Sequence, residues 1–138
     1  MSLSVAAELH AAPASRATLW AGRLLTALAV LFLLFDGVAK VMKVAPVLEA
    51  CARLDVPERV IPGLGAVLIA AALVYAFPRT SLLGAIVLTG YLGGATWTHV
   101  RMGGPAFPIA FPGLVAALIW GGLYLREPRL RALLPMRR

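Results

Sequence analysis

Long apolar runs alternate with short charged segments along the chain, and the charges mark where each run begins and ends. Four such runs cover residues 18–36, 60–78, 80–99 and 106–125. A helix needs roughly 20 residues to cross about 30 Å of hydrocarbon. None of the runs shows the strict alternation of a barrel strand. The pattern therefore predicts an all-α integral membrane protein, whose single domain over 1–138 forms a four-helix transmembrane bundle.

Two of the runs carry features that an ordinary span does not share. The first resembles the apolar part of a signal peptide, but the basic segment before it is weak, so we interpret it as a span. The last begins among Pro105, Pro108 and Pro112. Proline is tolerated best in the first turn of a helix, where its missing N–H costs nothing. We therefore expect an interrupted start and a regular helix from about Pro112.

The longest polar stretch between the runs is residues 46–56. Pro46 suits the start of a helix and Pro57 its end. Its apolar residues share one helical face: Val47, Leu48, Cys51 and Leu54. The segment thus predicts a short amphipathic helix at the membrane interface, which serves either as a connector that shields the mouth of the bundle or as part of a binding site.

Composition supports the membrane interpretation. Hydrophobic residues make up 61% and charged residues 14% of the chain, against about 45–50% and roughly 25% in a soluble domain. The one cysteine excludes a disulfide framework and a thiol pair. No second His, Cys or carboxylate stands at ligand spacing from His99, so we expect no metal site.

The net charge of +7 is divided unequally between the two sides of a four-span chain. Eight Lys and Arg residues lie on the side of the two termini, and five lie on the other side beside four carboxylates. The positive-inside rule then predicts that both termini are cytoplasmic. The basic tail, residues 126–138, is expected to face the anionic head groups of the bilayer. It is short and has no interleaved aromatic residues, so we expect no nucleic-acid partner.

Asp36, Lys40 and Lys43 are spaced to share one face at the outer end of the first helix. Asp36 and Lys40 can pair across one turn, which lowers the cost of placing either near hydrocarbon. Ionisable groups at membrane depth are candidates for function. Two interpretations stay open: an interfacial ion pair that ends the span, or a polar patch that holds a lipid head group or a quinone-like carbonyl.

The third run combines small residues with a histidine. Gly90, Gly93, Gly94 and Trp97 share one face, and Gly90 and Gly94 form a GxxxG pair that predicts close helix packing. His99 lies on the opposite half, where it could transfer protons or bond a neighbouring helix. An aromatic belt near the span ends is expected from Trp20, Tyr75, Tyr91, Trp97, Trp120 and Tyr124.

The segment Phe35-Asp36-Gly37-Val38-Ala39-Lys40 and the block from Pro78-Arg79-Thr80 to His99-Val100-Arg101 resemble the DoxX-like family. The resemblance covers roughly residues 19–125 and implies a small, multi-pass four-helix protein of the bacterial inner membrane. Relatives are linked to membrane redox and detoxification systems, and the family name derives from a subunit associated with a thiosulfate:quinone oxidoreductase.

Lys40, His99 and Arg101 match the family pattern, whereas two positions depart from it. Ala66 and Gly104 stand where the family often has Glu and Asp. The loss of these two acids weakens the idea of a proton relay between a carboxylate and histidine.

We therefore expect an accessory or quinone-proximal subunit of a membrane redox system, with a membrane oxidoreductase as partner and quinone as the candidate cofactor. The candidate site residues, which meet at the outer side because helices one and three end there, are Asp36, Lys40, His99 and Arg101. One alternative is a non-catalytic assembly protein whose Gly90, Gly93 and Gly94 face forms a homo-oligomer seam. Another is a small membrane enzyme that acts on a hydrophobic substrate within the bundle. Transport is less favoured, because four short helices leave little room for alternating access.

Overall fold

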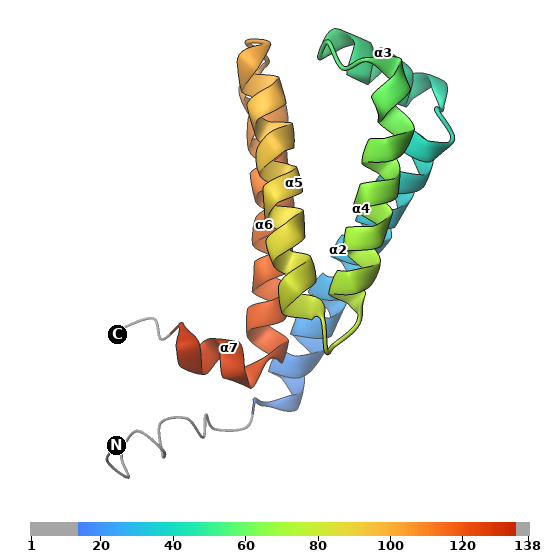
Figure 1. Ribbon diagram of the computed structural model, residues 1–138. Coiled ribbons are helices and arrows are strands. Elements are labelled where there is room, and N and C mark those ends of the chain that lie inside the picture. Colours follow the sequence, from blue (N-terminus) through green and yellow to red (C-terminus); the bar gives the residue numbers. More distant parts are fainter. Residues whose placement is uncertain (1–13, 135–138) are drawn as a thin grey trace.

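The computed structural model describes residues 14–134, and within this range the regular structure is entirely helical. The elements are α2 (Arg16–Val41), α3 (Ala45–Arg53), the short 3-10 helix η1 (Glu58–Val60), α4 (Ile61–Ala76), α5 (Ser81–Arg101), α6 (Ala106–Arg126) and α7 (Pro128–Leu133). The four long helices form two pairs, α2 with α4 and α5 with α6 (Figure 1). The pairs meet where α4 turns into α5, which we call the closed end, and diverge toward α3, which we call the open end.

Three of the long helices are long and apolar enough to cross a membrane. They are Arg16–Val41, Glu58–Ala76, which includes η1, and Ala106–Arg126. These helices identify the chain as a membrane protein. The helix α5 has 21 residues, but four glycines and three threonines lower its hydropathy, and it is not among the three. That α5 crosses the bilayer as a fourth span stays a prediction.

The start of α6 differs from the interrupted start expected from its prolines. The helix is continuous from Ala106, with Pro105 as its N-cap and Pro108 within its first turn. At these positions a missing N–H removes no helical hydrogen bond. Pro112 lies inside the helix and is buried. The prediction that regular helix begins only near Pro112 is therefore wrong.

Helix pairs approach most closely at glycines. A Cβ added at Gly65 of α4 would lie 2.6 Å from the carbonyl oxygen of Gly37 on α2, and one at Gly84 of α5 would lie 2.3 Å from the backbone nitrogen of Tyr75 on α4. A Cβ at Gly122 of α6 would lie 2.8 Å from the Thr26 hydroxyl on α2. These glycines let the four helices pack backbone against backbone.

The GxxxG pair of α5 does not take part in this packing. A Cβ added at Gly90, Gly93 or Gly94 would have no non-local atom within 4 Å in the structure. The three glycines therefore make no close helix contact within the described part of the chain. A contact between two copies of the chain stays a prediction.

A cluster of polar side chains joins α4, α5 and α6 by hydrogen bonds at the closed end. The Tyr75 hydroxyl donates to the Ile119 carbonyl at 2.7 Å, which joins α4 to α6. The Arg126 guanidinium donates to the Ser81 hydroxyl at 2.9 Å and lies 5.5 Å from the centre of the Tyr75 ring. Tyr75 is fully buried, so its expected place in the aromatic belt is wrong. Trp20, by contrast, is exposed.

Candidate functional site

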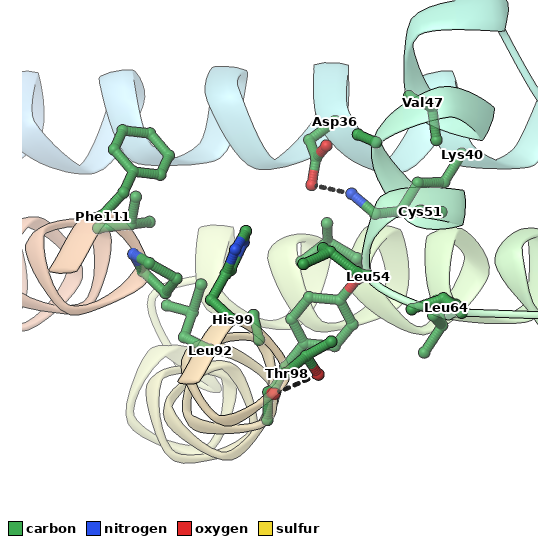
Figure 2. A pocket seen from close by; sticks show the side chains of 18 of the residues that line it. Asp36, Lys40, Val47, Cys51, Leu54, Leu64, Leu92, Thr98, His99 and Phe111 are labelled. Carbon is green, nitrogen blue, oxygen red and sulfur yellow. Dashed lines mark hydrogen bonds and ion pairs between the residues drawn. The ribbon is translucent and has the colours of Figure 1, made fainter. Parts of the chain in front are cut away.

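A cavity of about 660 Å³ occupies the wedge between the two helix pairs, toward the open end. The helices α2, α3, α4, α5 and α6 all contribute to its wall. The lining residues include Phe32, Asp36, Lys40, Val47, Cys51, Leu54, Leu64, Leu68, Gly90, Tyr91, Leu92, Gly94, Thr98, His99, Phe111, Pro112 and Val115. Figure 2 shows side chains from several of these elements converging on one space.

The deep part of the wall is apolar. Leu68, Leu92 and Val115 are buried side chains from α4, α5 and α6 that line it. Between α2 and α6, the rings of Phe32 and Phe111 meet edge to face with their centres 5.6 Å apart. An apolar molecule would thus find hydrocarbon and aromatic surface on several sides.

An ion pair lies in the α2 wall. The Lys40 ammonium donates to the Asp36 carboxylate one turn away, and the side chains are 16% and 33% exposed. Pairing offsets part of the cost of placing two charges beside apolar residues. An ammonium group has three N–H donors and a carboxylate accepts several bonds. Both groups therefore keep hydrogen-bonding capacity for a molecule in the cavity.

The α5 wall contributes His99, Tyr91 and Thr98. Figure 2 shows His99 projecting from α5 into the space toward α2, the helix that carries Asp36. The Thr98 hydroxyl donates to the Gly94 carbonyl at 2.8 Å, so its hydrogen is used within the helix. Among the hydrogen bonds formed by residues 14–134, none involves the His99 imidazole or the Tyr91 hydroxyl. These two groups are free to bind a ligand.

The position of His99 is fixed by the way α5 ends. Gly103 adopts a left-handed conformation, with φ of +64°. Its N–H bonds the Val100 carbonyl and the N–H of Gly104 bonds the His99 carbonyl, both at 3.0 Å. This is the Schellman arrangement, which glycine favours because it has no Cβ. His99 therefore lies in a closed last turn rather than in a fraying end.

The helix α3 covers the cavity with the face expected from the sequence. Val47, Cys51 and Leu54, of the four residues assigned to that face, line the cavity. Burial raises the pKa of the Cys51 thiol, the nearby Lys40 ammonium lowers it, and Asp36 raises it further. The thiol is thus held neutral beside the ion pair.

Two residues of the expected polar patch lie elsewhere. Arg101 is exposed, does not line the cavity, and donates to the Leu54 carbonyl at 3.3 Å. It joins the end of α5 to the chain after α3. Lys43 lies beyond the end of α2, because the helix stops at Val41, and its ammonium pairs with Glu58 at 3.2 Å. The structure therefore brings together Asp36, Lys40 and His99 and leaves the other two outside.

The predicted division of α5 into a packing face and a polar face is wrong. Gly90 and Gly94 line the cavity together with His99, whereas Gly93 and Trp97 face outward. The cavity covers about half of the circumference of α5, so residues assigned to opposite halves both reach it. The two glycines add room to the cavity where larger side chains would fill it.

Tyr91 is a cavity residue that the sequence predicts elsewhere. Its place near a span end predicts a role in the aromatic belt, although its spacing of seven residues from Thr98 puts both on one helical face. The structure also shows where the two positions lie that depart from the family pattern, Ala66 and Gly104. A Cβ at Gly104 would lie 3.9 Å from the His99 imidazole, whereas Ala66 is exposed. The missing acid at position 104 is therefore the one that would adjoin His99.

Within residues 14–134, no group of three or more His, Cys, Asp or Glu residues is placed to hold a metal ion. Fold and cavity together define a helical membrane protein with an amphiphilic pocket toward one end. Residues 24–122 match the DoxX-like family, and the chain belongs to that family. No curated protein and no solved structure matches it.

Proposed function

We propose that the chain is an accessory, quinone-proximal subunit of a membrane redox system, and that its cavity binds the head of a lipid-soluble, carbonyl-bearing molecule such as a quinone. One observation carries the proposal: polar groups with unused hydrogen-bonding capacity project from two opposite helices into an otherwise apolar cavity. A membrane oxidoreductase would be the partner that exchanges electrons with the bound molecule.

The cavity suits such a ligand in size and in the placing of its polar groups. Its volume of about 660 Å³ falls within the range of roughly 300–1,000 Å³ that small-molecule sites occupy. Lys40 offers N–H donors from α2, and His99 offers a donor or an acceptor from α5. The carbonyl oxygens of a quinone lie on opposite edges of its ring, so the two helices could each hold one.

A quinone, when bound, would supply reversible uptake of electrons and protons at its carbonyl groups. The residues of this chain would bind and orient it: Lys40 and His99 at the oxygens, Leu68 and Leu92 against the ring. The wall around them would keep water away from the ring. Asp36 would hold the Lys40 ammonium in place through their ion pair.

The proposed topology has four spans, with the closed end and both termini in the cytoplasm of the bacterial inner membrane. Arg79, Arg126, Arg129 and Arg131 lie at or near the closed end and support this orientation. A green fluorescent protein fused to the C-terminus should fluoresce, and alkaline phosphatase fused there should be inactive. The opposite pair of results would reverse the orientation.

Direct binding tests the function. The full chain in lipid nanodiscs would be titrated with a quinone that carries one isoprenoid unit. Loss of a charged or polar hydrogen bond costs about 1.5 kcal/mol or more, so Lys40→Met and His99→Ala should each weaken binding about tenfold. Lys43→Met is the matched control, because Lys43 is exposed at the same end and lies outside the cavity. Equal affinity in the wild type and both cavity variants would contradict the proposal.

A further inference from the structure

A second, smaller cavity adjoins the first. It has a volume of about 250 Å³ and is lined by His99, Phe107, Pro108, Phe111 and Pro112. Three of these residues, His99, Phe111 and Pro112, also line the main cavity. The two spaces therefore share a wall, made by the end of α5 and the first turns of α6.

An aromatic row runs from the main cavity past this wall. The ring centres of Phe32 and Phe111 are 5.6 Å apart, and those of Phe111 and Phe107 are 5.7 Å apart. Phe107 is 67% exposed on a helix that is apolar enough to cross the membrane. An exposed phenylalanine on such a helix is expected to face the lipid. The row thus leads from the main cavity to an exposed ring on the outer surface of α6.

The lining of the second cavity fits a hydrocarbon chain. Apart from His99 in the shared wall, its residues are two phenylalanines and two prolines. Because this lining has no charged side chain, it suits a length of hydrocarbon chain better than a second polar head. Its occupant should be an apolar extension of whatever occupies the main cavity, because the two spaces adjoin through three common residues.

We propose that the second cavity binds the tail of the ligand whose head occupies the main cavity, and that this ligand is long-tailed. The tail would leave the main cavity past Phe111 and lie over Phe107 and Pro108 before it enters the bilayer. This inference rests on the proposed function and narrows its ligand class to molecules with a polyisoprenoid or comparable chain.

Two analogues with the same quinone head test the inference, one with a single isoprenoid unit and one with four. Affinities in nanodiscs would be expressed per mole of lipid, so that partitioning into the bilayer cancels. In the wild type the long analogue should bind about fivefold tighter or more, since its tail makes van der Waals contacts with the second cavity that loosely packed lipid does not provide. Phe107→Ser should bring this ratio close to equality, because the tail loses its contacts with the ring. The variant should leave the short analogue unchanged, because Phe107 does not line the main cavity.

Phe35→Ser is the matched control. Phe35 is 77% exposed near the same end of the bundle and lines neither cavity, so this variant should keep the wild-type ratio. An unchanged ratio in Phe107→Ser would overturn the tail site while leaving the proposed function intact. Failure of both analogues to bind the wild type would instead overturn the proposed function.

A photoreactive group at the end of the tail gives an independent readout. Cleavage after arginine would release the peptide 102–126, which carries Phe107 and Pro108. The tail label should appear on this peptide and be lost in Phe107→Ser. A tail label confined to peptides from α2 or α4 would overturn the inference even if the affinities agree.

Discussion

The Lys40 ammonium and the Asp36 carboxylate form an ion pair one turn apart on α2, in the wall of the cavity that Cys51 helps to close from α3. The pair acts on the thiol in two directions. Lys40 lowers the pKa of Cys51 and Asp36 raises it, while burial, the largest effect, raises it. The pKa of the Cys51 thiol should therefore change when either member of the ion pair is replaced.

Cys51 should react slowly with a small thiosulfonate reagent near neutral pH. Because the pKa of the thiol is raised, the reactive thiolate forms only at a pH above its usual range. Asp36→Asn should shift the rate profile to lower pH, and Lys40→Met should shift it to higher pH. Cys51 is the only cysteine in the chain, so labelling is unambiguous.

Glu49→Gln is the control for this titration, since Glu49 is exposed on the same helix and is not among the causes of the shift. It should leave the profile unchanged. Shifts of the same sign in Asp36→Asn and Lys40→Met would contradict the arrangement of the ion pair.

The raised pKa of Cys51 also makes the stability of the fold depend on pH. The neutral buried thiol favours the fold at low pH, and this contribution is lost as the pH rises through the raised pKa.

Gly84 and Gly93 lie on the same helix and should respond oppositely to alanine. A Cβ at Gly84 would lie 2.3 Å from the Tyr75 backbone, whereas one at Gly93 would have no neighbour within 4 Å. Overpacking of a tight contact costs about 1–3 kcal/mol, and alanine gains up to about 1 kcal/mol over glycine in a helix. Gly84→Ala should lower the thermal unfolding midpoint in detergent, and Gly93→Ala should raise it or leave it unchanged.

Equal destabilisation by the two substitutions would contradict the close contact between Gly84 of α5 and the Tyr75 backbone of α4. A drop confined to Gly93→Ala, together with loss of a dimer on size-exclusion chromatography, would instead favour the assembly role, in which the glycine face joins two copies of the chain.

Tyr75→Phe tests the hydrogen bond that joins α4 to α6 at the closed end. The substitution removes the hydroxyl that donates to the Ile119 carbonyl and leaves that acceptor buried without this donor. A loss of about 1–2 kcal/mol in the free energy of unfolding is expected. Tyr124→Phe is the control, because Tyr124 is only partly buried. Equal stability of Tyr75→Phe and the wild type would contradict a stabilising role for this hydrogen bond at the closed end.

The long helices were predictable because charges and prolines mark their ends. The structure places α4 at Ile61–Ala76 and α6 at Ala106–Arg126, within or close to the runs 60–78 and 106–125. The all-helical class follows from the same pattern. The sequence also identified Asp36, Lys40 and His99 as unusual polar groups for membrane helices, and these three line one cavity.

The rotation of α5 about its axis could not be predicted, and neither could the burial of Tyr75. In lipid both sides of a helix are apolar, so hydrophobic periodicity does not show which side faces the bundle. The sequence offered Gly90 and Gly94 as a packing face, yet packing takes place at Gly84 and the two glycines border the cavity. Tyr75 can be buried because its hydroxyl donates to the Ile119 carbonyl. The two residues lie far apart in the sequence, so this hydrogen bond is visible only in the folded chain.

The most direct test of the central claim is the binding of the short-tailed quinone to Gly90→Leu and Gly93→Leu. Neither position has a neighbour that a Cβ would meet, so both variants should fold, but only Gly90 lines the cavity. The cavity account predicts that Gly90→Leu loses binding by about tenfold or more and that Gly93→Leu binds like the wild type. Undiminished binding in Gly90→Leu, with both variants folded, would contradict it.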